Sequence, residues 1–187
     1  VIFGGPMSAN DPDDYIKIET DWIGVALKEK KPFFGVCLGA QMLARVLGAR
    51  VALHPERVIE AGYFPIEPTE AGRVRGDWPE RFYEWHKEGF DVPASATLLA
   101  MSDGPFPNQA FAYGPAIGVQ FHPEITRLQV HRWTGNNAAR LTEPGAQPQH
   151  AHLDGHLRYA PQVHRWLDQT LRRWVGADIA ADPSGVT

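Results

Sequence analysis

Two patterns of hydrophobic residues meet near residue 37 and predict a strand followed directly by a helix. Residues 33–36 form a continuous apolar run that favours a buried strand. A helical spacing then places five apolar residues on one face: Leu38, Met42, Leu43, Val46 and Leu47. Gly48 is suited to end this helix, and the only cysteine, Cys37, falls at the turn between the two elements.

Similar patterns predict the elements before this turn. Asn10 or Asp11 can cap a helix with Pro12 in its first turn, and this helix should end by residue 32. Its expected apolar face comprises Tyr15, Ile18, Trp22, Val25 and Ala26. Residues 1–3 resemble the end of a core strand, so we expect one or more N-terminal strands to be missing from this sequence. The alternation of strands and helices favours an α/β fold with a mostly parallel sheet.

The middle of the chain is richer in strands, and its last third is helical. Predicted strands cover residues 51–53, 59–66, 81–85 and 97–101, followed by a hairpin of 109–113 and 117–121 around Gly114 and Pro115. Beyond Thr126 the helical signal is weak, 136–156 is predicted to be irregular, and 162–175 is an amphipathic helix. Residues from 176 onward are expected to form a tail. Without a repeat or linker, the pattern predicts a single domain over residues 1–187.

Composition narrows the classes of function. The chain has 187 residues and a net charge of −4, which argues against nucleic acid or an anionic membrane as a main partner. One cysteine excludes an internal disulfide and favours a reducing, cytoplasmic location. We find no apolar run near the roughly 20 residues that span a bilayer.

The surroundings of Cys37 suggest a reactive thiol, although a lone cysteine is more often a buried structural residue. Gly35 and Gly39 flank it and permit a sharp turn. The following helix directs its N-terminus toward the sulfur, which favours the thiolate.

A histidine and a carboxylate about eighty residues later supply the groups that a thiol needs. His122 and Glu124 follow the second hairpin strand, at the carboxyl end where reactive groups of open α/β sheets collect. Cys37, His122 and Glu124 would then act as nucleophile, base and orienting carboxylate. Backbone N–H groups of Gly5 and Leu38 are candidates for stabilising an oxyanion.

Three ordered motifs carry a family resemblance. These are Gly-Gly-Pro-Met-Ser at 4–8, Gly-Val-Cys-Leu-Gly-Ala-Gln at 35–41 and Gln-Phe-His-Pro-Glu at 120–124. Together they resemble the class I, triad-type glutamine amidotransferases, which include the glutaminase domain of GMP synthase. The resemblance implies a flavodoxin-like fold, the triad roles above, and a glutamine pocket lined by Gly4 and Gln41. It covers residues 1–125, and it implies no cofactor and no metal.

A fourth segment departs from the GMP synthase type, whose pocket carries a Ser-His-Gly-Asp sequence. Here Trp85, Lys87 and Glu88 replace the serine, glycine and aspartate, and only His86 is retained. We expect His86 to line the substrate pocket, with a structural histidine as the alternative. The segment is similar to stand-alone amidotransferase-like proteins, some of whose relatives cleave γ-glutamyl peptides.

Three functional hypotheses follow. The first is a glutaminase that delivers ammonia to a separate synthetase, since nothing after residue 125 resembles a nucleotide-binding loop. The second is a stand-alone γ-glutamyl hydrolase, and the third is an inactive relative that binds a metabolite or a protein. The group His150, His152, Asp154 and His156 is predicted to be a solvated loop rather than a metal site. Most of the six tryptophans are predicted to be core residues.

Overall fold

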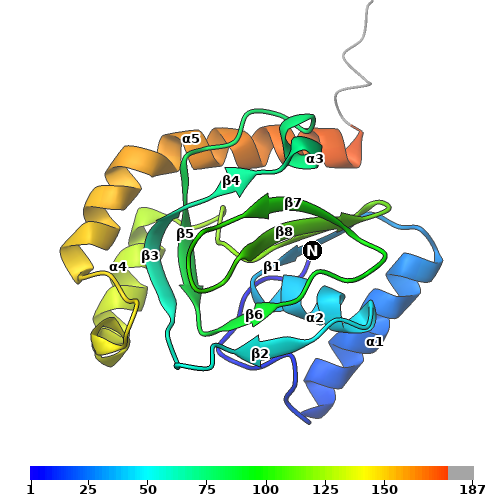
Figure 1. Cartoon of the computed structure of the whole chain (residues 1–187), viewed down its shortest axis with the longest axis horizontal. Helices are drawn as coiled ribbons and strands as arrows, with labels where there is room; N and C mark the ends of the chain where they lie inside the picture. The colour runs from blue at the N-terminus through cyan, green and yellow to red at the C-terminus, as the bar shows by residue number, and fades with distance from the viewer. Residues whose placement is uncertain (177–187) are drawn as a thin grey trace, which may run out of the picture.

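The computed structural model describes residues 1–176 and shows an α/β fold built on a five-stranded sheet (Figure 1). The strand order is β1-β9-β8-β7-β4. The bounds of these strands are Phe33–Val36 for β1, Ala116–Val119 for β9, Asn108–Tyr113 for β8, Thr97–Met101 for β7 and Glu67–Pro68 for β4. Two antiparallel pairs flank this sheet: β2 (Val51–Leu53) with β6 (Glu88–Phe90), and β3 (Glu60–Pro65) with β5 (Arg81–His86).

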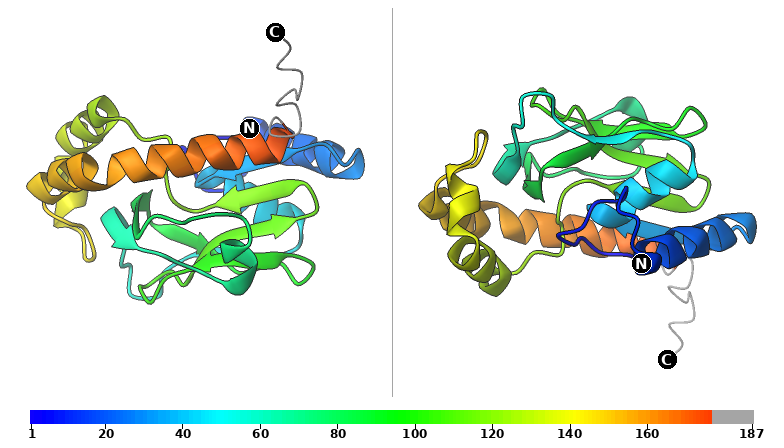
Figure 2. Two further views of the ribbon diagram at one scale, coloured as in Figure 1. Left: turned by 90° about the horizontal axis from the view of Figure 1, so that it is seen from above. Right: turned by 90° about the horizontal axis from the view of Figure 1, so that it is seen from below.

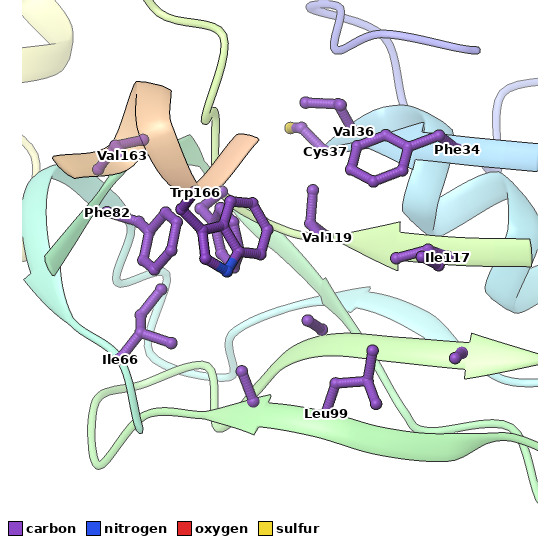
Figure 3. Close-up of a cluster of buried hydrophobic side chains, with 14 residues drawn as sticks. Phe34, Val36, Cys37, Ile66, Phe82, Leu99, Ile117, Val119, Val163 and Trp166 are labelled. Carbon is purple, nitrogen blue, oxygen red and sulfur yellow. The ribbon is translucent and has the colours of Figure 1, made fainter. Parts of the chain in front are cut away.

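Helices pack on both faces of the five-stranded sheet. Their bounds are Asp14–Lys28 for α1, Leu38–Val46 for α2, Glu70–Arg73 for α3, Arg127–Asn136 for α4 and Gln149–Val175 for α5, with a 3₁₀ helix η1 at Ala138–Thr142. Phe34 and Val36 face the side covered by Trp166 of α5, where Cys37 lies at the edge of the same apolar cluster (Figure 3). Phe33, the residue before Phe34, points to the opposite face of the strand and packs with residues of α1 and α2.

The sheet is mixed rather than mostly parallel. β1 and β9 pair in parallel, and Ile2 forms a parallel bridge with Gly35. In contrast, β9–β8, β8–β7 and β7–β4 are antiparallel. Short connections such as the turn at Gly114 can join only antiparallel neighbours, whereas β1 and β9 are separated by a long crossover. The predicted α/β class and the hairpin are confirmed, and the proportion of parallel pairing is lower than expected.

Helix α1 buries a different face from the one predicted. Four residues of the predicted face are about half exposed or more: Tyr15, Ile18, Trp22 and Val25. Ala26 is buried as predicted, but together with Ile16 and Ile23. Apolar residues recur at helical spacing on two faces of this segment, so periodicity alone cannot decide which face meets the core. The helix also begins at Asp14, a few residues after the predicted cap.

Helix α5 extends into the segment predicted to be irregular. It begins at Gln149 and contains Pro161 in its interior. The prediction of a solvated loop for this group is wrong, because His152 and His156 are buried and bond to the hydroxyls of Tyr83 and Tyr63. These tertiary contacts outweigh the weak helical propensity of the segment.

Figure 2 shows α5 extending along the long dimension of the molecule, from α4 toward α1. None of the helices within residues 1–176 combines the length and the apolar character needed to cross a membrane. The predicted tail falls almost entirely on residues 177–187, outside the described residues.

Candidate active site

The turn after β1 places Cys37 in an unusual backbone conformation. Its φ of 50° and ψ of −106° are strained for a residue other than glycine, and its N–H donates to the Val119 carbonyl at 2.8 Å. A Cβ on Gly35 would lie 2.6 Å from backbone atoms of Gly39, and one on Gly39 would lie 2.2 Å from the Ile2 carbonyl oxygen. Both flanking positions therefore require glycine, as the sequence predicted.

This geometry puts the thiol at the N-terminus of α2. Cys37 is the N-cap residue, 5% exposed, and forms no disulfide. Leu38 is the first residue of the helix, so its N–H has no intrahelical acceptor and is available to an oxyanion. Gly5 lies next to it, since a Cβ on Gly5 would contact the Leu38 side chain at 3.2 Å.

His122 and Glu124 lie beside Cys37, as the sequence predicted. The His122 N–H donates to the Tyr83 carbonyl at 2.8 Å, and its Nδ1 lies 2.8 Å from Glu124 Oε1. A Cβ on Gly4 would lie 2.6 Å from His122 Cε1 and 3.2 Å from Cys37 Cβ, so both side chains lie close to the Gly4 backbone. The His122 and Cys37 side chains also form a hydrogen bond with each other. The three predicted triad residues therefore share one site.

The electrostatic setting of His122 favours the imidazolium. Burial opposes the charge, but the charges of Cys37 and Glu124, and the hydrogen bonds to both, raise the pKa of His122 to about 10. A protonated imidazole beside a thiolate is the resting form of many thiol nucleophiles. Glu124 Oε1 accepts a hydrogen bond from His122 Nδ1, which leaves the other ring nitrogen, Nε2, to face the thiol of Cys37.

A cavity of about 430 Å³ opens in front of the thiol. Its lining includes the predicted residues Gly4, Gly5, Cys37 and His122, and four that the sequence did not predict as pocket residues: Trp85, Trp133, Asn137 and Arg140. The indole of Trp133 meets the His122 ring edge-on at 5.0 Å. Trp133, Asn137 and Arg140 come from α4 and the segment after it, beyond the last motif, where only the tertiary structure shows that they approach Cys37.

Gln41 and His86 lie next to the thiol in a narrower recess. Both are 3% exposed, and both bond to the carbonyl oxygen of Glu88, from Gln41 Nε2 at 2.8 Å and from His86 Nδ1 at 2.9 Å. Gln41 thus lies one turn into α2, facing the segment that departs from the GMP synthase type. Its role and that of His86 in binding substrate stay predictions.

The other ring nitrogen of His86 faces two buried carboxylates. His86 Nε2 lies 3.0 Å from Glu60 Oε2, with which it forms a hydrogen bond, and 3.2 Å from Glu84 Oε2. Burial opposes the imidazolium, but Glu60 and Glu84 outweigh it and raise the pKa of His86 to about 10, while burial raises the pKa of Glu84 to about 7.

Among the described residues, Glu60, Glu84 and His86 form the group whose ligand atoms lie close enough together to hold a metal ion. A protonated His86 already supplies a positive charge between the carboxylates, so a metal and the imidazolium proton would compete for one position.

Comparison with known proteins agrees with this arrangement. The profile of the family Glutamine amidotransferase class-I matches residues 1–137, a range that contains Cys37, His122 and Glu124. The chain belongs to this family. The resemblance inferred from the three motifs is therefore confirmed.

Several relatives in the family share about a third of their aligned residues with this chain. The glutamine amidotransferase-like protein YfeJ of Salmonella typhimurium is 34% identical over an alignment of 137 residues, which covers 67% of this chain and 56% of YfeJ. A glutamine-hydrolyzing GMP synthase subunit of Ignicoccus hospitalis is 33% identical over 135 residues, 69% of this chain and 68% of that protein. The chain spans about half the length of YfeJ. It spans 25% of the length of the GMP synthase of Aeropyrum pernix.

Solved structures of the family have the same fold. A glutamine amidotransferase from Thermotoga maritima superposes with a TM-score of 0.81 at 32% identity, covering 92% of this chain and 75% of that one. A glutamine amidotransferase from Methylobacillus flagellatus gives a TM-score of 0.84 at 28% identity, covering 92% and 74%. The predicted flavodoxin-like fold is confirmed by these structures.

Proposed function

We propose that this protein is a glutamine amidotransferase-type cysteine hydrolase that cleaves the γ-carboxamide of glutamine through a γ-glutamyl thioester. The observation that carries the proposal is the strained turn that holds Cys37 at a helix N-terminus beside the His122–Glu124 pair. Family membership supports the same chemistry, and both GMP synthase relatives described above are named as glutamine-hydrolysing.

The first half-reaction forms the thioester. The Cys37 thiolate attacks the γ-carbonyl carbon, and the carbonyl oxygen becomes an oxyanion that the N–H groups of Leu38 and Gly5 stabilise. His122 then transfers its proton to the leaving nitrogen, the C–N bond breaks, and ammonia departs.

The second half-reaction regenerates the enzyme. Water loses a proton to His122 and attacks the thioester carbon, which releases glutamate and restores the thiolate. Glu124 holds Nδ1 throughout, so the same nitrogen of His122 faces the reacting atoms in both steps.

A separate acceptor enzyme would receive the ammonia. The support for this is the likeness to the Ignicoccus hospitalis protein, which is named as one glutamine-hydrolysing subunit of GMP synthase. The second candidate is a stand-alone γ-glutamyl hydrolase, which the replacement of the Ser-His-Gly-Asp segment and the size of the cavity favour.

The test is glutamate release from glutamine by the purified protein, with Cys37→Ala as the matched variant. We expect activity to fall by about 10⁴-fold or more in the variant, since removal of a triad nucleophile costs at least this in comparable enzymes. A glutamine-like chloroketone should add one adduct to the wild-type protein, at Cys37, and none to the variant.

Three outcomes would contradict the proposal. Unchanged activity in Cys37→Ala would assign the hydrolysis to a contaminant or another site. No adduct and no hydrolysis of glutamine or any γ-glutamyl amide would instead support the inactive relative. Hydrolysis of γ-glutamyl dipeptides with negligible glutaminase activity would favour the stand-alone hydrolase.

A further inference from the structure

The cavity in front of Cys37 is larger than glutamine hydrolysis requires. Its volume of about 430 Å³ lies in the range of pockets that hold drug-sized ligands, whereas ammonia as a leaving group needs almost no space. Cys37 lines both this cavity and the recess of Gln41 and Glu88, so the scissile carbonyl would lie where the two meet. The recess holds only about 30 Å³, so a glutamyl group would also occupy part of the larger cavity. At about 430 Å³ that cavity still leaves room for a substantial leaving group.

The wall of that larger cavity carries Arg140, a cation that also lines the recess. Arg140 is half-buried, and its guanidinium lies 5.1 Å from the centre of the Trp85 ring. Its Nε is buried and forms no hydrogen bond within the described part of the chain. No carboxylate among the described residues forms an ion pair with Arg140, although Glu143, Cys37 and Tyr83 contribute more distant negative charges.

A half-buried guanidinium whose Nε has no hydrogen-bond partner is costly unless a ligand completes it. Burial lowers the pKa of Arg140, which is the sign of a charge held in a poorly solvated place. The guanidinium presents a planar fork of N–H donors that fits a carboxylate in two parallel hydrogen bonds. The nearby indoles of Trp85 and Trp133 and the amide of Asn137 make the rest of this wall suitable for a small amino-acid side chain.

We propose that Arg140 is a specificity-determining residue that binds a carboxylate on the leaving group, so that the preferred substrates are γ-glutamyl amino acids. This rests on the proposed thioester chemistry of Cys37 and deepens the second candidate function, the stand-alone γ-glutamyl hydrolase. The thiolate bonds to the γ-carbonyl carbon, the C–N bond breaks, and the departing amino acid takes its proton from His122. Water then hydrolyses the thioester, which gives glutamate and one free amino acid.

The test compares two substrates that differ only in this carboxylate. We expect wild-type protein to cleave γ-glutamylglycine with a higher kcat/KM than γ-glutamylglycinamide, whose amide carries no charge. Arg140→Gln should lower kcat/KM for γ-glutamylglycine by about tenfold or more, because a hydrogen bond to a charged group is lost. The same variant should change kcat/KM for γ-glutamylglycinamide by less than about threefold. Arg132→Gln, at an exposed position of the neighbouring helix α4, is the matched control and should leave both values unchanged.

Equal losses on both substrates and on glutamine would overturn the proposal, because Arg140 would then bind the α-carboxylate that all three share. The proposal would also be overturned if Arg140→Gln left the ratio of kcat/KM for γ-glutamylglycine to kcat/KM for γ-glutamylglycinamide unchanged. Hydrolysis that still depends on Cys37 would show that only the role of Arg140 had failed. Loss of the proposed Cys37 function itself would instead show as no Cys37-dependent hydrolysis of any substrate.

A binding measurement keeps the inference testable without turnover. In the Cys37→Ala background, calorimetry should show γ-glutamylglycine binding more tightly than its glycinamide analogue, with the difference removed by Arg140→Gln. The absence of any preference for the carboxylate in this background would overturn the assignment of Arg140, whatever the enzyme's activity.

Discussion

Individual residues of the site are held by contacts that leave little freedom. His122 is fixed at its backbone by Tyr83, at Nδ1 by Glu124, and on one face by the Trp133 indole. On the remaining side the Gly4 backbone approaches the imidazole closely. Small changes at these contacts should therefore affect catalysis more than stability.

Gly4→Ala tests this close approach. The added methyl would lie 2.6 Å from His122 Cε1, so the imidazole or the loop must move, and a displacement near 1 Å can cost about 10²-fold in rate. We expect kcat to fall by that order while the melting temperature changes little. Gly24→Ala is the control, because its methyl would meet nothing within 4 Å in helix α1, and it should retain full activity. Comparable activity in both variants would contradict the proposed position of Gly4.

Glu124→Gln tests the orienting carboxylate through the pH dependence of the rate. The pKa of His122 is raised to about 10 against the effect of burial, with the negative charges of Cys37 and Glu124 as causes. Removing one of these charges lowers this pKa, so the imidazolium that protonates the leaving group is lost at lower pH. We expect kcat/KM to fall by about 10²–10⁴-fold and its alkaline limb to move toward neutral pH. A limb at the wild-type position would show that Glu124 does not act on His122.

At the scale of elements, the site depends on how closely three backbone segments approach. Residue Ile2 bonds to both sides of Gly35, through the Phe34 carbonyl at 3.0 Å and the Val36 N–H at 2.9 Å. Helix α2 then packs its Gly39 against the Ile2 carbonyl. The strand, the turn at Cys37 and the N-terminal segment are thus tied together by glycine contacts as well as by hydrogen bonds.

Gly39→Ala should loosen this arrangement. Its methyl would lie 2.2 Å from the Ile2 carbonyl oxygen, which is backbone and can move only with its strand, so we expect a loss of about 1–3 kcal/mol in the free energy of unfolding. Gly135→Ala in helix α4 is the matched control, since its methyl would have no neighbour within 4 Å and alanine favours helices. Urea unfolding measures both variants. An equally stable or more stable Gly39→Ala protein would contradict the packing described.

At the scale of the whole molecule, the buried Glu60–His86–Glu84 cluster makes stability depend on pH. It connects β3 and β5 and lies among buried residues. The pKa values of both Glu84 and His86 are higher in the folded protein than their ordinary values, so the folded state binds protons more tightly than the unfolded state. The stabilisation is therefore present at low pH and is lost as pH rises.

Glu84→Gln should remove much of this dependence. For wild-type protein the contribution of Glu84 is lost between its ordinary pKa of 4.5 and its folded value of about 7, and that of His86 between 6.5 and about 10. We expect the variant to lose less stability than wild type between pH 5 and pH 8, by on the order of 1–3 kcal/mol. Denaturant unfolding at several pH values measures this, and parallel curves for the two proteins would contradict it.

The sequence by itself was sufficient for the local structure around the nucleophile. The apolar run of β1, the glycines at 35 and 39 and the apolar face of α2 are short-range patterns, and each has the structure that its spacing predicts. The same holds for the hairpin of β8 and β9, whose end carries His122. Three motifs in a fixed order were enough to infer the family, because each supplies a group that the others need.

Only the tertiary structure decided the surroundings of this site and the choice between equivalent faces. Trp133 and Arg140 reach Cys37 through the path of α4 and η1, which depends on contacts distant in sequence. The buried face of α1, and the burial of His152 and His156 in α5, were likewise decided by neighbours such as Tyr63 and Tyr83. Periodicity shows which positions of an element are apolar. Which of them are buried, and so gain the free energy of burial, depends on the surface that packs against the element.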